Sequence, residues 1–197
     1  MPVVRANGID MYYELHGQGE PLVMIMGLSA NLDWWDPLIV ERLSKRYRLL
    51  LFDNRGAGRT EKPETEYAIP IFAQDTAELM TQVGIERAYI LGVSMGGMIA
   101  QEFALHYPER VNKLILVCTN CGGSQSVPAA PEVLALLANR DVSPEEFKQR
   151  QFKLLFPDHF VAARSDKLER FWERVQRAPI PLAAFYRQIG AIQAFST

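Results

Sequence analysis

The sequence lacks the features that mark membrane-spanning or secreted proteins. No apolar run approaches the roughly 20 residues that a membrane-spanning helix needs, and the amino-terminal MPVVR has no apolar signal-peptide segment. The 197 residues carry a net charge of −2, with lysine and arginine scattered along the chain, so no basic surface for nucleic acid is expected. We therefore expect a cytoplasmic protein with neither a membrane nor a nucleic-acid partner.

Cysteine is scarce, which limits metal and redox chemistry. The two cysteines, Cys118 and Cys121, form a C-x-x-C pattern. A thioredoxin-like pair would stand at the start of a helix, whereas glycines follow here, and a zinc site would need two more ligands close by. We expect reduced, structural cysteines, no metal and no cofactor.

Short apolar runs alternate with helical segments over the first 120 residues. Continuous apolar runs are typical of strands buried on both faces, and Asn7-Gly8 between two β-like runs predicts a hairpin. The alternation predicts an α/β fold, with a mainly parallel sheet, an amino-terminal antiparallel hairpin and helices on both faces. The expected buried strands are residues 22–26, 47–52, 88–91 and 111–117.

The pattern changes after residue 122, where a linker-like GGSQSVP leads into helical segments only. Prolines stand at the expected first turns of these helices. We expect two domains, a core at residues 1–122 and a helical cap at residues 123–197 laid over the carboxyl edge of the sheet. A separate helical interaction module is the alternative. The expected helices are residues 131–139, 144–156, 165–178 and 181–194.

The stretch GVSMG at residues 92–96 has the pattern of a nucleophile elbow. An apolar strand precedes it and a helix-forming segment follows. Glycines two residues before and after Ser94 remove the Cβ atoms that would collide as the strand folds back into the helix. The first N–H groups of that helix, beginning with that of Met95, would point at developing negative charge.

Three motifs in this order and spacing resemble the α/β-hydrolase fold superfamily, in the branch of small bacterial esterases, lactonases and perhydrolase-like enzymes. Residues 23–28 (VMIMGL) resemble the oxyanion loop of that family, and residues 53–60 (DNRGAGRT) resemble its Asp-x-Arg-Gly-x-Gly-x-Ser turn. Residues 92–97 (GVSMGG) are the third motif. The resemblance covers residues 3–120 closely and the helical segment loosely. It implies a sheet that lacks the last strands of the family.

The resemblance implies roles for individual residues. Ser94 corresponds to the nucleophile, and the backbone N–H groups of Leu28 and Met95 correspond to the oxyanion hole. Met26 stands where the family usually has histidine, which removes a polar group beside the loop.

The other matched positions imply less. The turn that begins at Asp53 is expected to be structural, with substrate contact as the alternative. Trp34 and Trp35 are candidate substrate-binding residues, with packing against the cap as the alternative interpretation.

A base and an acid for Ser94 are missing from the expected places. A serine hydroxyl is a poor nucleophile without a base, and the family places Asp or Glu and then His after the serine. His106 lies at the far end of the helix after Ser94, about 18 Å along its axis; His159 falls in the cap, and His16 precedes the core on a turn. We therefore expect a C-terminally truncated hydrolase with an exposed apolar edge, which dimerises or needs a complementing fragment.

Two function classes follow. The first is a serine hydrolase of small-molecule carboxylic esters or lactones with apolar acyl groups, which forms an acyl-enzyme at Ser94; perhydrolase and carbon–carbon bond hydrolase activities are variants. The second is a catalytically incomplete fragment or pseudo-enzyme, which acts as a binding module or as half of a split enzyme. Halide- and epoxide-cleaving relatives are disfavoured, because they carry Asp at the position of Ser94.

Overall fold

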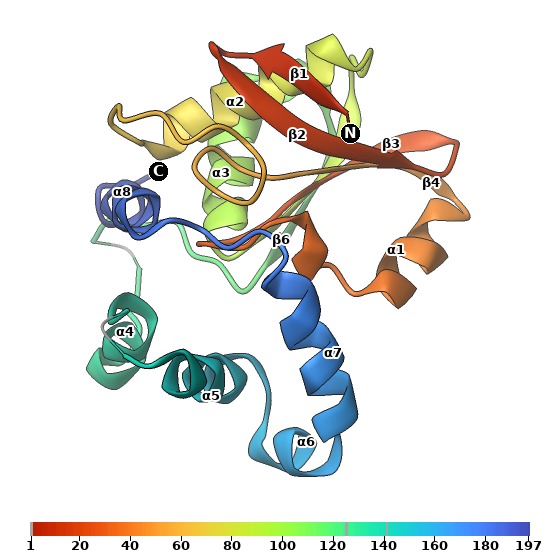
Figure 1. Ribbon diagram of the computed structural model, residues 1–197. Coiled ribbons are helices and arrows are strands. Elements are labelled where there is room, and N and C mark those ends of the chain that lie inside the picture. Colours follow the sequence, from red (N-terminus) through yellow and green to blue (C-terminus); the bar gives the residue numbers. More distant parts are fainter. Residues whose placement is uncertain (1, 125, 141) are drawn as a thin grey trace. The chain divides into compact units, whose positions relative to one another are not determined.

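The fold is built on one sheet, seen in a computed structural model that describes residues 2–124, 126–140 and 142–197. Six strands in these ranges have the order β1-β2-β4-β3-β5-β6 (Figure 1). Strands β4, β3, β5 and β6 are parallel to one another, whereas β2 pairs antiparallel with β4 and β1 pairs antiparallel with β2. The strands are β1 (Val3–Ala6), β2 (Ile9–His16), β3 (Glu20–Ile25), β4 (Tyr47–Phe52), β5 (Ala88–Val93) and β6 (Val111–Val117).

Helices follow or connect these strands and make up the second half of the chain. In the part of the chain that the structure describes, no helix has the length and apolarity needed to cross a membrane. The helices are α1 (Pro37–Ser44), α2 (Ile69–Gln82), α3 (Met95–His106), α4 (Pro131–Ala138), α5 (Pro144–Leu155), α6 (Asp158–Ala163), α7 (Ser165–Val175) and α8 (Leu182–Gln193), with 3₁₀ turns η1 (Leu32–Trp34) and η2 (Pro108–Arg110).

This architecture confirms the predicted α/β class and the amino-terminal hairpin. Asn7 and Gly8 both have positive φ, 47° and 77°, as a two-residue hairpin turn requires. The turn sets Ala6 opposite Ile9 and so fixes the register of β1 against β2.

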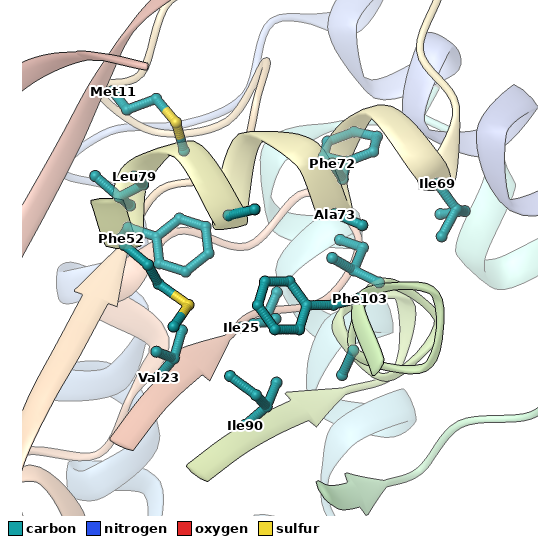
Figure 2. Packing of buried hydrophobic residues seen from close by; sticks show 14 of the residues in the cluster. Met11, Val23, Ile25, Phe52, Ile69, Phe72, Ala73, Leu79, Ile90 and Phe103 are labelled. Atoms are coloured by element: carbon teal, nitrogen blue, oxygen red, sulfur yellow. The ribbon is translucent and has the colours of Figure 1, made fainter. Parts of the chain in front are cut away.

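Alternate residues of the central strands enter two hydrophobic clusters, one on each face of the sheet. Val23 and Ile25 of β3 belong to the cluster that includes residues of α2 and α3, whereas Met24 belongs to the cluster against which α1 packs. Figure 2 shows the first cluster, where side chains of β3, β4 and β5 meet α2 and α3 around Phe103. This period of two explains why β3, β4 and β5 read as continuous apolar runs.

Strand β6 departs from its prediction as a buried strand. Its apolar side chains at positions 114–117 are 37–43% exposed, although β3 and β4 are mostly buried and the residues of β5 alternate between buried and half-buried. The physical reason is its place in the sheet. β6 is the last strand in the described order and pairs only with β5, so its outer edge has no neighbour there. The exposed apolar edge agrees with a sheet that lacks further strands.

The chain divides into two compact units, and the division differs from the expected boundary at residue 123. Residues 1–126 and 178–197 form one unit, and residues 127–177 form the other. Helix α8 therefore belongs to the unit of the sheet. Its Ala191 and the following Phe195 are buried in the α2–α3 cluster, and its Gln188 bonds to two loops of the same unit. These buried contacts explain the grouping.

The second unit, residues 127–177, has an aromatic core of its own. Phe152 is buried and makes an edge contact with Trp172, with ring centroids 6.0 Å apart. Leu168 and Val175 of α7 are also buried. Lys148 of α5 pairs with Glu169 of α7 at 2.7 Å. Whether this unit acts as a cap stays a prediction.

Candidate active site

Ser94 lies on the turn between β5 and α3 in a backbone conformation that few residues adopt. Its φ is 57° and its ψ is −121°, outside the regions that suit residues with a Cβ atom. Backbone hydrogen bonds hold it there. Its N–H donates to Val117 O at 2.9 Å, and its carbonyl accepts from the N–H of Gly97 at 2.8 Å. The turn leaves the serine exposed at the carboxyl end of β5.

The positions around Ser94 require glycine for a steric reason. A Cβ atom at Gly92 would collide with the carbonyl oxygen of Gly96. A Cβ atom at Gly96 would collide with the carbonyl of Ile25 and lie 2.7 Å from Met26 O. All of these are backbone atoms that cannot rotate away. The spacing of the motif therefore reflects how closely β5, α3 and the end of β3 approach one another.

The loop after β3, residues 26–30, passes directly beside the serine; we call it the oxyanion loop after the family motif that it resembles. A Cβ atom at Gly27 would lie 3.0 Å from Ser94 Cβ. The N–H of Ala30 donates to Gly27 O at 3.3 Å, which closes a tight turn. Because N–H and C=O point in opposite directions across a trans peptide, this bond aims the N–H of Leu28 away from the turn.

Two backbone N–H groups are available next to Ser94. Among the described residues, no group accepts a hydrogen bond from the N–H of Leu28 or of Met95. Met95 is the first residue of α3, where the N–H groups have no partner within the helix and the helix dipole is positive. The arrangement can stabilise a negatively charged oxygen formed at the serine.

Buried polar groups fix the start of the oxyanion loop. The Nδ2 of Asn54 donates to Met26 O at 2.8 Å, and both residues are buried. Met26 stands where the family that the sequence resembles usually has histidine. Its backbone is held by Asn54, which lies just after β4. This bond holds the loop backbone at position 26, where the side chain itself carries no polar hydrogen-bonding group comparable to histidine.

Asp53 ties the end of the loop to the following turn. One carboxylate oxygen accepts from Leu32 N and the other from Arg59 N, each at 2.7 Å. Burial raises the pKa of the Asp53 carboxyl, an effect that the two N–H groups oppose. Its side chain is fully buried and bonded to the backbone, which fits the predicted structural role of the turn.

The same turn is anchored to α2 by a buried ion pair. Arg55 Nε and Nη2 donate to the two oxygens of Asp75 at 2.8 and 2.6 Å. Asn7 Nδ2 adds a bond of 2.6 Å to Asp75 Oδ1. Burial raises the pKa of the Asp75 carboxyl, while the guanidinium and the amide act against that change. Arg55 is therefore occupied by a structural partner.

Trp34 and Trp35 both pack with the hydrophobic cluster on the α1 side of the sheet. Trp35 is buried, and its indole Nε1 has no hydrogen-bond partner in the described ranges. Trp34 is half-buried. Contact of either ring with a substrate stays a prediction.

The histidines in the unit of Ser94 lie at other places. His16 pairs with Leu49 near the amino ends of the parallel strands, and its Nε2 lies 2.8 Å from Glu14. His106 closes the carboxyl end of α3, with Nδ1 3.0 Å from Glu102 O. His159 belongs to the other unit. The described part of the Ser94 unit therefore places no imidazole beside the serine.

Cys118 and Cys121 form no disulfide and belong to no metal-binding group among the described residues. No group of three or more His, Cys, Asp or Glu side chains there could hold a metal ion. Cys118 and Cys121 are both free thiols, and Cys118 has a positive φ of 49°. The C-x-x-C pattern follows the end of β6.

Gln188 lies beside the candidate site, although no sequence motif points to it. Its fully buried side chain accepts from Ser29 N at 2.8 Å and donates to Arg55 O at 2.9 Å. One signal was present. Gln188 shares a helix face with Ala184 and Ala191, all of them buried, and a polar residue on an apolar face needs a buried partner.

The chain belongs to the alpha/beta hydrolase fold family, whose model matches residues 20–189. It is 32% identical over 171 residues to the "Putative carbamate hydrolase RutD" of Azorhizobium caulinodans, covering 86% of this chain and 63% of that protein. It is 36% identical over 129 residues to the poly(3-hydroxyalkanoate) depolymerase of Ectopseudomonas oleovorans, covering 66% and 44%.

A solved structure resembles this chain along its whole length. The alpha/beta hydrolase fold protein from Chitinophaga pinensis is 28% identical, with a TM-score of 0.82, and the match covers 100% of this chain and 72% of that one. The chain thus spans less than two thirds of the two curated relatives and about three quarters of the solved one.

Proposed function

We propose that this chain carries the nucleophile and the oxyanion hole of a hydrolase that acts on carboxylic esters or lactones with apolar acyl groups. The observation that carries the proposal is the approach of the oxyanion loop to Ser94. It leaves two N–H groups without partners, on Leu28 and Met95, at a serine held in a strained turn. The names of the relatives, a carbamate hydrolase and a polyester depolymerase, support a substrate with an attacked carbonyl.

In the proposed reaction, Ser94 Oγ attacks the ester carbonyl carbon and loses its proton to a base. The carbonyl oxygen becomes negative and accepts hydrogen bonds from the N–H groups of Leu28 and Met95. The bond to the alcohol oxygen then breaks, the alcohol takes up the proton, and an acyl group remains on Ser94. Water attacks this acyl-enzyme and releases the acid. A lactone follows the same course and opens its ring.

The second candidate is a catalytically incomplete module, alone or as half of a split enzyme. The observation that favours it is the position of the histidines in the unit of Ser94, since His16 and His106 both lie away from the serine and pair with other groups. Without a base, the hydroxyl is a weak nucleophile at neutral pH. The candidates therefore differ in one property, the activation of Ser94.

A fluorophosphonate probe separates the two candidates. The probe is added to the folded wild-type chain and to Ser94→Ala, and labelling is followed by mass spectrometry. Stoichiometric labelling that is absent in Ser94→Ala supports the hydrolase, whereas an unlabelled but folded wild type supports the incomplete module. Labelling that appears only after a second polypeptide is added supports the split enzyme. Circular dichroism of both chains shows that each is folded.

A further inference from the structure

We propose that Gln188 is a positioning residue that clamps the oxyanion loop against the nucleophile elbow. The role of the clamp in a reaction rests on the function proposed above. The clamp itself is a structural statement about one side chain, which lies 159 residues after Ser29 and bonds to it within the same unit.

The clamp acts on the loop at its most unusual residue. Ser29 has a φ of 62°, a conformation that residues with a Cβ atom adopt only when their surroundings hold them there. The N–H of Ser29 donates its hydrogen bond to Gln188 Oε1. This bond fixes the peptide that follows Leu28, and the turn bond between Ala30 N and Gly27 O fixes the peptide that precedes it. Together they orient the N–H of Leu28.

Gln188 joins this loop to the neighbouring turn through its side-chain nitrogen. Its Nε2 donates to the carbonyl of Arg55 at 2.9 Å. The side chain of Arg55 is in turn held by Asp75 of α2. The amide therefore links α8, the oxyanion loop and the turn after β4, and each of these is anchored elsewhere in the core.

The amide is well suited to this position because it supplies one acceptor and one donor at a fixed distance. Its side chain has no exposure to solvent, so water cannot replace either bond. A buried N–H or C=O left unpaired is costly. Loss of the amide would release the loop at Ser29, and a displacement of about 1 Å at such a site can slow a reaction about 100-fold.

Hydrogen exchange measured by NMR tests the clamp without any need for activity. In the wild type, the Ser29 amide is expected to be protected although it lies in a loop. In Gln188→Met, which keeps the length of the side chain but not its polar atoms, we expect the protection of Ser29 to fall about 10-fold or more. Thr76→Val is the matched control, because it removes another buried bond, from Thr76 Oγ1 to Phe72 O, away from the loop.

Gln188→Glu is the conservative variant. A buried carboxyl is held neutral at about pH 5, and the neutral group offers one acceptor and one O–H donor as the amide does. Restored protection of Ser29 in Gln188→Glu supports the clamp. Equal protection of Ser29 in Gln188→Met and Thr76→Val overturns it. If Gln188→Met fails to fold, the exchange rate of the Ser29 amide in the wild type decides. An unprotected amide overturns the clamp, and a protected amide supports it.

The contribution of Gln188 to the reaction is measured by the rate of fluorophosphonate labelling and by the rate of ester hydrolysis. We expect Gln188→Met to lower kcat about 10- to 100-fold with little change in KM, because the oxyanion forms only in the transition state. Thr76→Val should leave kcat unchanged. A folded wild type that is not labelled favours the incomplete module over the hydrolase, while the exchange data still judge the clamp.

Discussion

Strands β5 and β6 are neighbours with similar apolar sequences, yet their surroundings differ. Ile90 of β5 is fully buried, whereas its register partner Leu114 of β6 is 37% exposed. β5 lies between β3 and β6, and its Ile90 packs in the cluster with residues of α3. β6 pairs only with β5 in the described sheet. An apolar run therefore identifies a strand, while the neighbours in space decide its burial.

The difference matters because the candidate site lies at the carboxyl end of β5, and β5 has β3 on one side and β6 on the other. Ser94 directly follows β5, and Gly96 in the same turn is in tight contact with the end of β3. From β6 the turn receives one backbone bond, from Ser94 N–H to Val117 O. Gly97 also lies close to Thr119, just after β6, so the elbow is held from both sides, and its contacts on the side of β3 are with buried residues. Substitutions on the β5 side should disturb it far more than substitutions on β6.

The largest effect is expected from Gly96→Ala. The added Cβ atom would collide with the carbonyls of Ile25 and Met26, and the backbone would have to move. We expect the free energy of unfolding to fall by about 3 kcal/mol or more. The shift would also displace the oxyanion loop, so labelling of Ser94 should slow. Denaturant unfolding and the labelling rate measure the two effects.

Gly190→Ala is the matched control for this substitution. Gly190 lies in α8, and a Cβ atom there would meet nothing within 4 Å. The change should stabilise the protein by about 0.5–1 kcal/mol, since alanine favours a helix more than glycine does. Equal unfolding free energies for Gly96→Ala and the wild type would show that the contact between α3 and β3 is looser than the structure indicates.

The second effect compares Ile90→Ala with Leu114→Ala directly. Ile90→Ala empties a buried position and should cost about 2–5 kcal/mol. Leu114→Ala removes a side chain that is already partly in water and should cost less than about 1 kcal/mol. Both values come from denaturant unfolding at the same low protein concentration. A cost for Leu114→Ala close to that of Ile90→Ala would show that β6 is covered in solution.

The sequence predicted the order of strands and helices along the first half of the chain. It also identified the turn that bears Ser94. These features depend on local rules: apolar runs for strands, Asn7-Gly8 for a hairpin, and glycines where backbones approach. For the same reason the elbow could be predicted from five residues, because strand, turn and helix are contiguous there.

Features set by distant contacts could not be predicted. The exposure of β6 depends on which strand lies beyond it. The placement of α8 depends on Gln188, which meets Ser29 and Arg55 only after folding. The helical pattern of residues 182–193 gives a helix but not the surface against which it packs. The oxyanion loop was predicted from its resemblance to a family, and the groups that hold it were not.

The smallest effect on stability is expected from Ile115→Lys. Ile115 is 41% exposed on β6, so a lysine there can reach water and should change the free energy of unfolding by less than about 1 kcal/mol. Its effect on association should be larger, because an apolar edge strand pairs readily with other chains and a charge opposes that pairing. Sedimentation velocity over a range of concentrations should show less self-association than in the wild type.

Leu38→Lys on α1 removes another exposed apolar side chain, away from the sheet edge, and should leave association unchanged. An equal decrease in both variants would mean that general surface apolarity, rather than the open side of β6, drives association.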